Sequence, residues 1–160
     1  MRMSEGVEWA VHSCLNLAWL GEERAVPAAK LAAFYELPAA YLNKQLQALA
    51  RAGIVASTSG PRGGFRLARP PEKITLMDVV AAIEGEEEAF RCTEIRRRGG
   101  SDSGERNGPP CAIHTSMRKA ELAWRRELAS QTIAGIASTV EDHSPAAPER
   151  VRRWFGDTRT

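Results

Sequence analysis

Apolar residues recur every three or four positions in four segments of the first half of the chain, which predicts four helices. These segments are residues 4–20, with Ser4 as the expected cap, and residues 26–35, 38–52 and 76–83. Only two residues separate the second segment from the third, and the third presents a polar face opposite its leucine stripe. Two helices joined by a tight turn, the second with a polar outer face, are typical of a helix-turn-helix.

A β-hairpin is predicted directly after the third helix. Residues 54–58 and 65–68 have the composition of short strands, and the turn between them is rich in glycine and proline. A hairpin in this position is the wing of a winged helix-turn-helix, with Arg62 at its tip. Thr75 is the expected cap of the next helix. We therefore expect residues 1–85 to form a winged helix-turn-helix DNA-binding domain.

The helical periodicity disappears after residue 85 and returns in one long stretch. Residues 86–112 are Gly-rich and charged, and long loops of this kind are usually functional or disordered. Helical spacing then runs from residue 111 to about residue 140, a length on the order of 40 Å, which exceeds what one small domain covers. We expect residues 113–140 to be a dimerisation helix and residues 141–160 a loosely attached tail. The expected fold class is mainly α with a small β-hairpin wing, a winged helix-turn-helix plus a long C-terminal dimerisation helix.

Composition and charge limit the class of protein. The chain has 160 residues, 43% of them hydrophobic, which suits one core with extensions rather than two large domains. It has no apolar run long enough to span a membrane and no signal peptide, so we expect a cytoplasmic protein without a membrane partner. The net charge is only +2, but residues 37–73 hold six basic residues against one acidic residue. Such a patch suits contact with DNA phosphates.

The residues expected to contact double-stranded DNA lie on the third helix and the wing. Side chains near the start of a recognition helix reach base edges, and a basic wing tip reaches the minor groove or a phosphate. The candidates are Tyr41, Asn43, Lys44, Gln47 and Arg62. The alternative is that the polar side of the helix is simply a solvated face.

A second group of residues has the chemistry of a metal site. Glu8 and His12 are four residues apart and therefore share a face of the first helix, next to Trp9. Alone, such a pair is more often a surface hydrogen bond than a ligand set. Cys92 and Cys111 add two thiolates, and two thiolates, an imidazole and a carboxylate complete the four ligands of a [2Fe–2S] cluster. Thiolates favour iron–sulfur clusters or zinc over hard cations.

The spacing of these donors leaves alternatives open. His114 follows Cys111 by three residues and competes with His12 as the nitrogen ligand. Glu94 competes in the same way with Glu8. The third cysteine, Cys14, lies on a different face of the first helix and is expected to be a small buried hydrophobe.

The chain resembles the dimeric winged-helix regulators that include the cluster regulator IscR, the nitric oxide sensor NsrR and the redox sensor RsrR, with the RsrR type most similar in pattern. The resemblance covers residues 7 to about 140. The segments that carry it are GVEWAVH at 6–12, YLNKQLQAL at 41–49, GPRGGF at 60–65, ITLMDVV at 74–80 and FRCTEIR at 90–96. Most cluster-binding members place three cysteines in the loop, whereas this chain has two there.

The resemblance implies a homodimer in which each cluster bridges the two subunits. The implied ligands are Glu8 and His12 of one subunit with Cys92 and Cys111 of the other. An imidazole in place of a thiolate raises the reduction potential of a cluster, so the implied function is redox sensing. Trp9, next to two of these ligands, is a candidate redox gate or simply a packing residue.

Two functional hypotheses follow. The first is a redox-responsive, cluster-binding repressor or other transcription regulator. The second keeps the winged helix but uses the two loop cysteines as a thiol switch, or the loop as a docking surface for a partner enzyme. An enzyme with a small-molecule substrate is not expected, because the sequence shows no nucleophile–base pairing and no phosphate-binding glycine loop.

Overall fold

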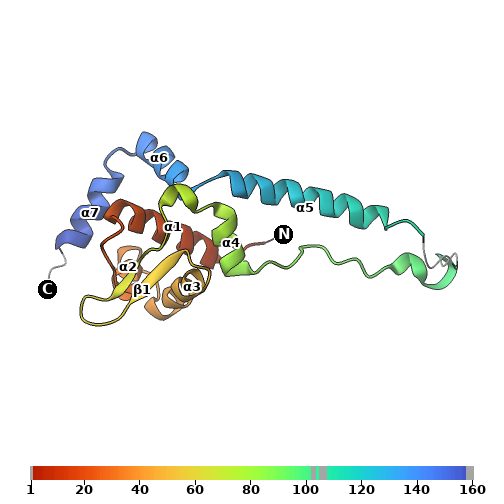
Figure 1. The fold of residues 1–160 in the computed structure, drawn as a ribbon, viewed down its shortest axis with the longest axis horizontal. Coiled ribbons are helices and arrows are strands. Elements are labelled where there is room, and N and C mark those ends of the chain that lie inside the picture. Colours follow the sequence, from red (N-terminus) through yellow and green to blue (C-terminus); the bar gives the residue numbers. More distant parts are fainter. Residues whose placement is uncertain (1, 102–103, 105–107, 158–160) are drawn as a thin grey trace.

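The computed structural model describes residues 2–101, 104 and 108–157 of the chain. A lobe of helices with one hairpin carries a long projecting arm, which consists of α5 and the loop that precedes it (Figure 1). The elements are α1 (Glu5–Leu20), α2 (Ala28–Phe34), α3 (Ala39–Arg51), β1 (Val55–Thr58), β2 (Gly64–Leu67), α4 (Leu76–Glu84), α5 (Ala112–Ser130), α6 (Ile133–His143) and α7 (Ala147–Asp157). Short 3-10 turns occupy Pro71–Lys73, Ile95–Arg97 and Gly99–Ser101.

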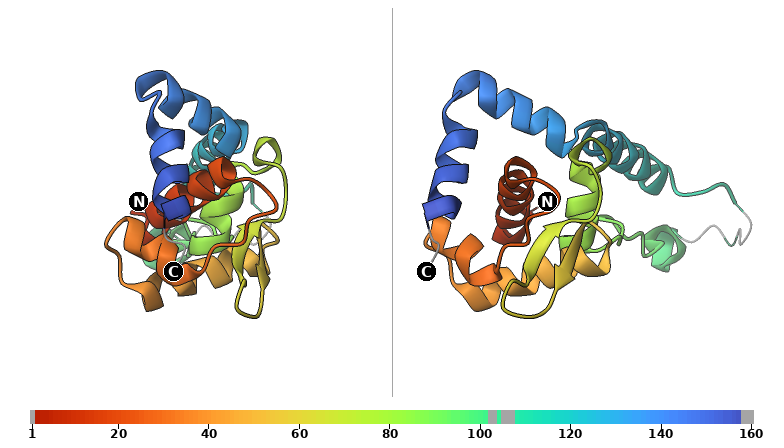
Figure 2. Two further views of the ribbon diagram at one scale, coloured as in Figure 1. Left: turned by 90° about the vertical axis from the view of Figure 1, so that its left-hand side faces the viewer. Right: turned by 60° about the vertical axis from the view of Figure 1, so that its left-hand side comes forward.

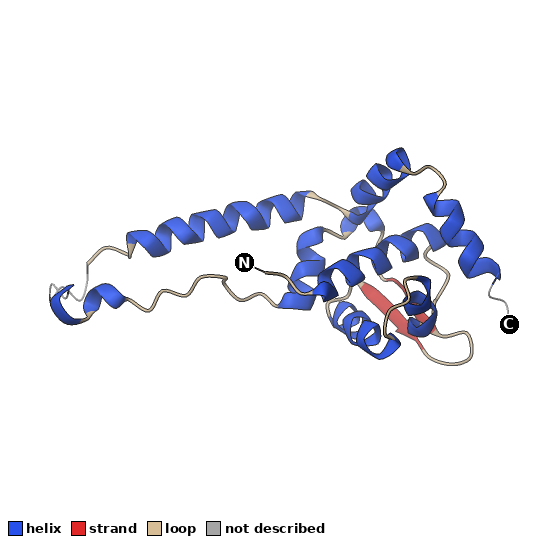
Figure 3. Ribbon diagram, turned by 180° about the vertical axis from the view of Figure 1, so that it is seen from behind, coloured by secondary structure: helices blue, strands red, loops and turns tan. Residues whose placement is uncertain are grey.

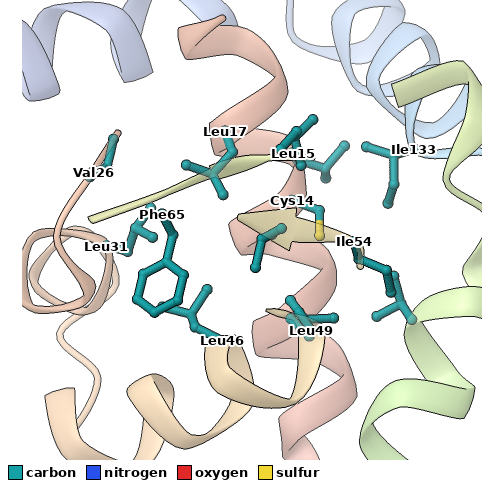
Figure 4. Packing of buried hydrophobic residues seen from close by; sticks show 14 of the residues in the cluster. Cys14, Leu15, Leu17, Val26, Leu31, Leu46, Leu49, Ile54, Phe65 and Ile133 are labelled. Atoms are coloured by element: carbon teal, nitrogen blue, oxygen red, sulfur yellow. The ribbon is translucent and has the colours of Figure 1, made fainter. Parts of the chain in front are cut away.

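The helix α1 passes through the middle of the lobe and packs against α3, α4, α6 and α7. Its apolar face holds Cys14, Leu15 and Leu17, all almost fully buried. Figure 4 shows these side chains in one cluster with Leu46 of α3, Phe65 of the hairpin and residues of the neighbouring elements. One continuous core therefore fixes the first helix relative to the DNA-binding elements.

The helix-turn-helix is formed by α2 and α3, as the sequence predicts. Glu36 adopts a left-handed conformation, with φ 55°, in the turn between them. The N–H of Leu37 donates to the carbonyl of Ala32 at 2.9 Å, which closes the turn. The second helix begins at Ala28 rather than at residue 26, because Val26 forms a β-bridge with Phe65 and the two exchange N–H···O bonds of 2.8 Å.

The predicted wing is present as an antiparallel hairpin, with Val55 opposite Leu67 and Thr58 opposite Gly64. Helices otherwise dominate the described part of the chain (Figure 3). The predicted cap at Thr75 is also present, as a capping box in which Thr75 and Asp78 each bond the other's backbone N–H. Ser4 makes no side-chain cap bond to α1, because its hydroxyl donates to Glu84 instead.

The prediction of one helix from residue 111 to about 140 is wrong, because the chain is extended between α5 and α6. The carbonyl of Gln131 accepts the N–H of Leu76 at 2.8 Å, and the N–H of Ile133 donates to Ile74 at 2.8 Å. Thr132 then caps α6 by accepting from the N–H of Gly135. These bonds tie the junction to the strand-like segment before α4, so only α5 projects from the lobe.

The prediction of a loosely attached tail is wrong for the described residues. The helix α7 packs against α1, and its Val151 and Phe155 are buried. The Phe155 ring stacks on Phe34 of α2 with 5.5 Å between centroids. Residues 158–160 of the predicted tail, and residues 102–103 and 105–107 of the predicted loop, lie outside the described residues.

Among the described helices, none combines the length and the apolar character needed to cross a membrane. The expected fold class is confirmed as a mainly helical protein with a two-stranded hairpin, although its C-terminal part consists of several helices rather than one long helix.

Candidate functional site

The recognition helix α3 divides cleanly into a buried and an exposed face. Its leucines are fully buried, and Gln45 is nearly so, packed beneath Gly6 of α1. The exposed side chains are those that the sequence nominates for DNA contact: Tyr41, Asn43, Lys44 and Gln47. Arg62 is exposed at the wing tip. The structure therefore leaves all five candidates accessible to a DNA groove.

Glu8 and His12 are both exposed on α1. The Nδ1 atom of His12 lies 3.4 Å from the hydroxyl of Tyr35, which also donates to Asn16 Oδ1 at 3.3 Å. Asn16 is fully buried, and its Nδ2 has no hydrogen-bond partner among the described residues. Burial raises the pKa of Tyr35, which keeps its phenol protonated and able to donate.

Trp9 makes a second aromatic contact between α1 and the helix-turn-helix. Its ring meets that of Tyr41 edge-on, with 5.0 Å between centroids. Trp9 is half-buried and also packs against the core. His12 and Trp9 therefore touch two different tyrosines of the DNA-binding unit, one at the end of α2 and one in the first turn of α3.

Cys92 and Cys111 lie together on the projecting arm, across a cleft of about 580 Å³ between the loop and the start of α5. Both cysteines line this cleft, and the Cys92 side chain is one of the neighbours that lower the pKa of the Cys111 thiol. The Cys92 thiol also lies 3.9 Å from Glu94 Oε1, to which it donates. The structure thus brings together the two predicted thiol ligands, although 18 residues separate them in the sequence.

Arg96 ties the two ends of this loop together. Its Nε donates to Glu94 Oε2 at 2.9 Å and its Nη2 donates to the carbonyl of Pro109 at 2.7 Å. The Arg96 guanidinium holds the pKa of Glu94 below its ordinary range. The described residues between Cys92 and Pro109 form only short 3-10 turns, so this cross-link helps to keep the two ends of the loop together.

The Cys111 thiol lies at the N-terminus of α5, where backbone N–H groups are not used within the helix. The backbone N–H of His114 is the largest of the influences that lower its pKa, and the N–H of Ile113 acts in the same direction. Burial has the opposite effect on Cys14 and raises its pKa from 9.0 to about 12. The expectation that Cys14 is a buried hydrophobe is confirmed.

The four predicted ligands form two pairs that do not meet within one chain. In the described part of the chain, no three His, Cys, Asp or Glu side chains converge in a way that could hold a metal ion. The alternative ligand Glu94 lies beside Cys92, and His114 lies near Phe90 with its Nδ1 buried and unpartnered. Neither completes a site in a single chain.

Sequence reasoning missed three residues around these pairs: Tyr35, Asn16 and Arg96. Tyr35 is 23 positions from His12, and only the packing of α1 on α2 brings them together. Arg96 belongs to a run of three arginines that has no periodicity, so its bond to Pro109 leaves no sequence signal. Asn16 is a polar residue on an apolar face, and that mismatch is a signal that could have identified it.

Comparisons with known proteins indicate the same class of molecule. The family model "Rrf2: Iron-dependent Transcriptional regulator" matches residues 3–139. The protein YffB of Lactococcus lactis subsp. lactis is 32% identical over 142 residues, which cover 88% of this chain and 90% of YffB. The HTH-type transcriptional regulator IscR of Aliivibrio salmonicida is 30% identical over 118 residues, which cover 74% of this chain and 66% of IscR.

The fold is shared with a solved structure. CymR (YrzC), the global cysteine regulator of B. subtilis, superposes with a TM-score of 0.66 at 23% identity, over 87% of this chain and 98% of CymR. The family consists of transcriptional regulators, which confirms that the chain is not an enzyme. The family model spans most of the chain, so the chain belongs to the Rrf2 family of DNA-binding transcriptional regulators.

Proposed function

We propose that the chain is a homodimeric, redox-responsive regulator of the RsrR type, with a [2Fe–2S] cluster at each of two sites between subunits. Glu8 and His12 of one subunit and the partner subunit's Cys92 and Cys111 are the proposed ligands. The observation that carries the proposal is the division of the donors into two accessible pairs, one on the lobe and one on the arm (Figure 1). Only a second chain can complete either pair.

The donor set suits this cofactor. Two soft thiols that line one cleft match the preference of iron–sulfur clusters for thiolates. When bound, the cluster supplies one-electron redox chemistry, and replacing thiolates by an imidazole favours reduction at a higher potential. Nδ1 of His12 forms a hydrogen bond with the Tyr35 hydroxyl, so Nε2 is the ring nitrogen that would bind iron.

The contacts of α1 give this proposal a route to DNA. His12 touches Tyr35 at the end of α2, and Trp9 touches Tyr41 at the start of α3. A movement of either side chain would therefore shift the helix-turn-helix, whose second helix carries Asn43, Lys44 and Gln47. We assign Trp9 the role of redox gate on this basis.

The arm supplies a surface for the second subunit. No residue of the 19-residue α5 is buried, and its Ile113 and Met117 are 66% and 44% exposed. They are four positions apart and share a face of the helix. An isolated arm would leave these apolar groups in water, whereas a second copy covers them.

A mixed dimer tests the division of ligands directly. One chain carries Glu8→Ala and His12→Ala, and the other carries Cys92→Ala and Cys111→Ala. Each homodimer should be colourless after anaerobic reconstitution, because both of its sites lack ligands. The heterodimer retains one complete site, so it should show half of the wild-type visible absorbance, iron and sulfide.

The control for this experiment is Cys14→Ala, which should keep the full cluster content because Cys14 is buried away from both pairs. A heterodimer with no more iron than the homodimers would contradict ligation between subunits. Colourless wild type with stoichiometric zinc would overturn the cluster itself. If His12→Ala kept an unchanged visible spectrum, the nitrogen ligand would be reassigned from His12 to His114.

The position of Cys92 and Cys111 in one cleft also favours a second function, a thiol switch without a cluster. A peroxide would accept the two electrons as the two thiols release two protons and form one disulfide, while the peroxide becomes water and an alcohol or a second water. Mass mapping after peroxide treatment would detect the Cys92–Cys111 bond. DNA affinity that follows this disulfide, and that ignores iron chelation, would favour the switch over the cluster.

The roles proposed for the DNA-contacting residues can be separated by site selection from random duplexes. Gln47→Ala should relax the preference at one base pair, at a cost of about 1–3 kcal/mol, because a side-chain amide reads adenine through two bonds. Arg62→Ala should weaken binding to all sequences almost equally if the wing holds phosphate. An unchanged selected sequence for Gln47→Ala would contradict base reading by this residue.

A further inference from the structure

A cationic cleft of about 790 Å³ lies between the wing tip and the start of α2. Of the residues proposed to bind the cluster or DNA, only Arg62 lines it. Its described lining contains three cations, Arg24, Lys30 and Arg62, and no acidic side chain. The remainder is small or apolar, and it includes Gly63 of the wing and Gly156 of α7. The charge and the small side chains favour an anion that approaches as an extended chain.

The helix α7 forms one edge of this cleft, and it lies beyond the residues 3–139 that the family model matches. Phe155 anchors it, because its ring is 1% exposed and stacks on Phe34 of α2. The Phe155 carbonyl accepts a hydrogen bond from Nη2 of Arg24. Arg24 is thereby held at the cleft, although it lies in the irregular segment between α1 and α2.

The cleft lies on the side of the lobe that presents the DNA-binding elements. Figure 2 (right) shows α2, α3 and the hairpin along the lower edge of the lobe, with the end of α7 beside α2. Because the wing tip forms one wall, the cleft is continuous with the surface that carries Arg62. A DNA strand that passes from the recognition helix toward the wing would present its phosphates to this edge.

We propose that this cleft binds the phosphate backbone of duplex DNA, with Arg24 and Arg62 as the phosphate contacts and α7 as the element that positions Arg24. The proposal rests on the DNA-binding function of the chain but not on the cluster. Guanidinium groups suit phosphate oxygens, since their planar N–H pairs match that geometry. The contact is independent of base sequence, so it adds affinity to every duplex.

The salt dependence of binding tests the proposal without knowledge of the operator. Fluorescence anisotropy with a mixed-sequence duplex of roughly 30 base pairs, about three helical turns, gives the slope of log K against log salt. Each lost phosphate contact should reduce the magnitude of this slope by about 0.9. Arg24→Gln removes one contact from each of the two subunits of the proposed dimer, so the slope should fall by about 1.8 in magnitude. The wild-type advantage in affinity should therefore shrink about 12-fold between about 50 mM and 200 mM salt.

Three further variants complete the test. Arg62→Gln should give the same change of slope, and the double variant should give about twice that change. Arg24→Lys keeps the charge and should restore the wild-type slope. Arg126→Gln, an exposed arginine on α5, is the matched control and should leave the slope unchanged.

An Arg24→Gln slope equal to that of Arg126→Gln would overturn the proposal, as would an Arg24→Lys slope as low as that of Arg24→Gln. Wild type that shows no salt-dependent binding to any duplex would instead overturn the DNA-binding function, and the cleft with it. The two failures are thus distinguished by the behaviour of the wild-type protein alone.

Discussion

Single residues on α1 have opposite environments within a few positions. His12 is exposed, whereas Cys14 is fully buried in the core two residues later. The same helix therefore exposes Glu8 and His12 on one face and packs the lobe together with the other. The difference has a direct consequence for the chemistry of the two kinds of cysteine, because only Cys92 and Cys111 are accessible to oxidants or iron.

The buried Cys14 predicts a specific pH dependence of stability. Its pKa is about 12 in the folded protein instead of 9.0, so the folded state holds the proton more tightly than the unfolded state. The stabilisation is complete below pH 9 and is lost as the pH rises towards 12, by at most about 1.4 kcal/mol per pH unit. Urea unfolding of wild type and Cys14→Ala should show their free energies of unfolding converging above pH 9. Parallel curves from pH 7 to 11 would contradict this.

Gly64 allows the wing to approach the backbone of Val26 closely. It has φ +145°, and a Cβ placed there would lie 2.3 Å from the carbonyl carbon of Val26. Gly64→Ala should therefore cost about 2–3 kcal/mol, because the bridge between Val26 and Phe65 cannot form without a backbone shift. Gly60→Ala is the control: φ is also positive, but nothing lies within 4 Å, so its cost should be about 1 kcal/mol. Equal midpoints in urea for the two variants would refute the role of this close approach.

At the scale of elements, periodicity and caps in the sequence predict the first half well. The leucine stripe of α3, the capping residue Thr75 and the Gly-rich hairpin are local signals, and local structure follows them. The break at Gln131 has no such signal, since it arises from pairing with a segment more than 50 residues earlier. The docking of α7 was missed for the same reason, because its apolar residues could be interpreted only once Phe34 was known to lie beside them.

The docking of α7 predicts that this helix contributes to global stability. Phe155→Ala removes a fully buried ring, and we expect a loss of roughly 3–5 kcal/mol in the free energy of unfolding. Arg150→Ala, an exposed position on the same helix, should change stability by less than about 0.5 kcal/mol. Thermal unfolding followed by circular dichroism separates these outcomes. A Phe155→Ala midpoint within 1 °C of that of Arg150→Ala, about the limit of such a comparison, would mean that α7 does not dock in solution.

At the scale of the whole molecule, the residues by themselves indicate a set of donors, and only the family resemblance predicts how the donors divide between two subunits. Chemistry and the family resemblance point to Glu8, His12, Cys92 and Cys111, and the structure brings the two cysteines together on the arm. The distance in sequence says nothing about which chain supplies which pair. The shape of the molecule supports the proposed division, because the arm that carries Cys92 and Cys111 projects away from the lobe that contains α1 (Figure 1).

The proposed ligand set predicts that cluster binding depends on dimerisation, even though each chain carries all four ligands. We expect wild type to have twice the 17.5 kDa mass of one chain in light scattering. Met117→Glu places a charge on the apolar face of α5, and burying an unpaired charge is costly enough to dissociate the dimer. Its position on the arm, exposed in one chain, should leave the lobe folded. The variant should therefore be monomeric, helical and colourless after anaerobic reconstitution.

Ser116→Glu is the matched control, since it adds the same charge at an exposed neighbouring position that points about 100° away around the helix. It should remain dimeric and coloured. Two outcomes for Met117→Glu are decisive. A coloured monomer would show that one chain suffices for the ligands, which would overturn the shared site. A colourless dimer would show that dimerisation does not need Met117 whereas cluster binding does, which would place Met117 at the cluster rather than at the subunit interface.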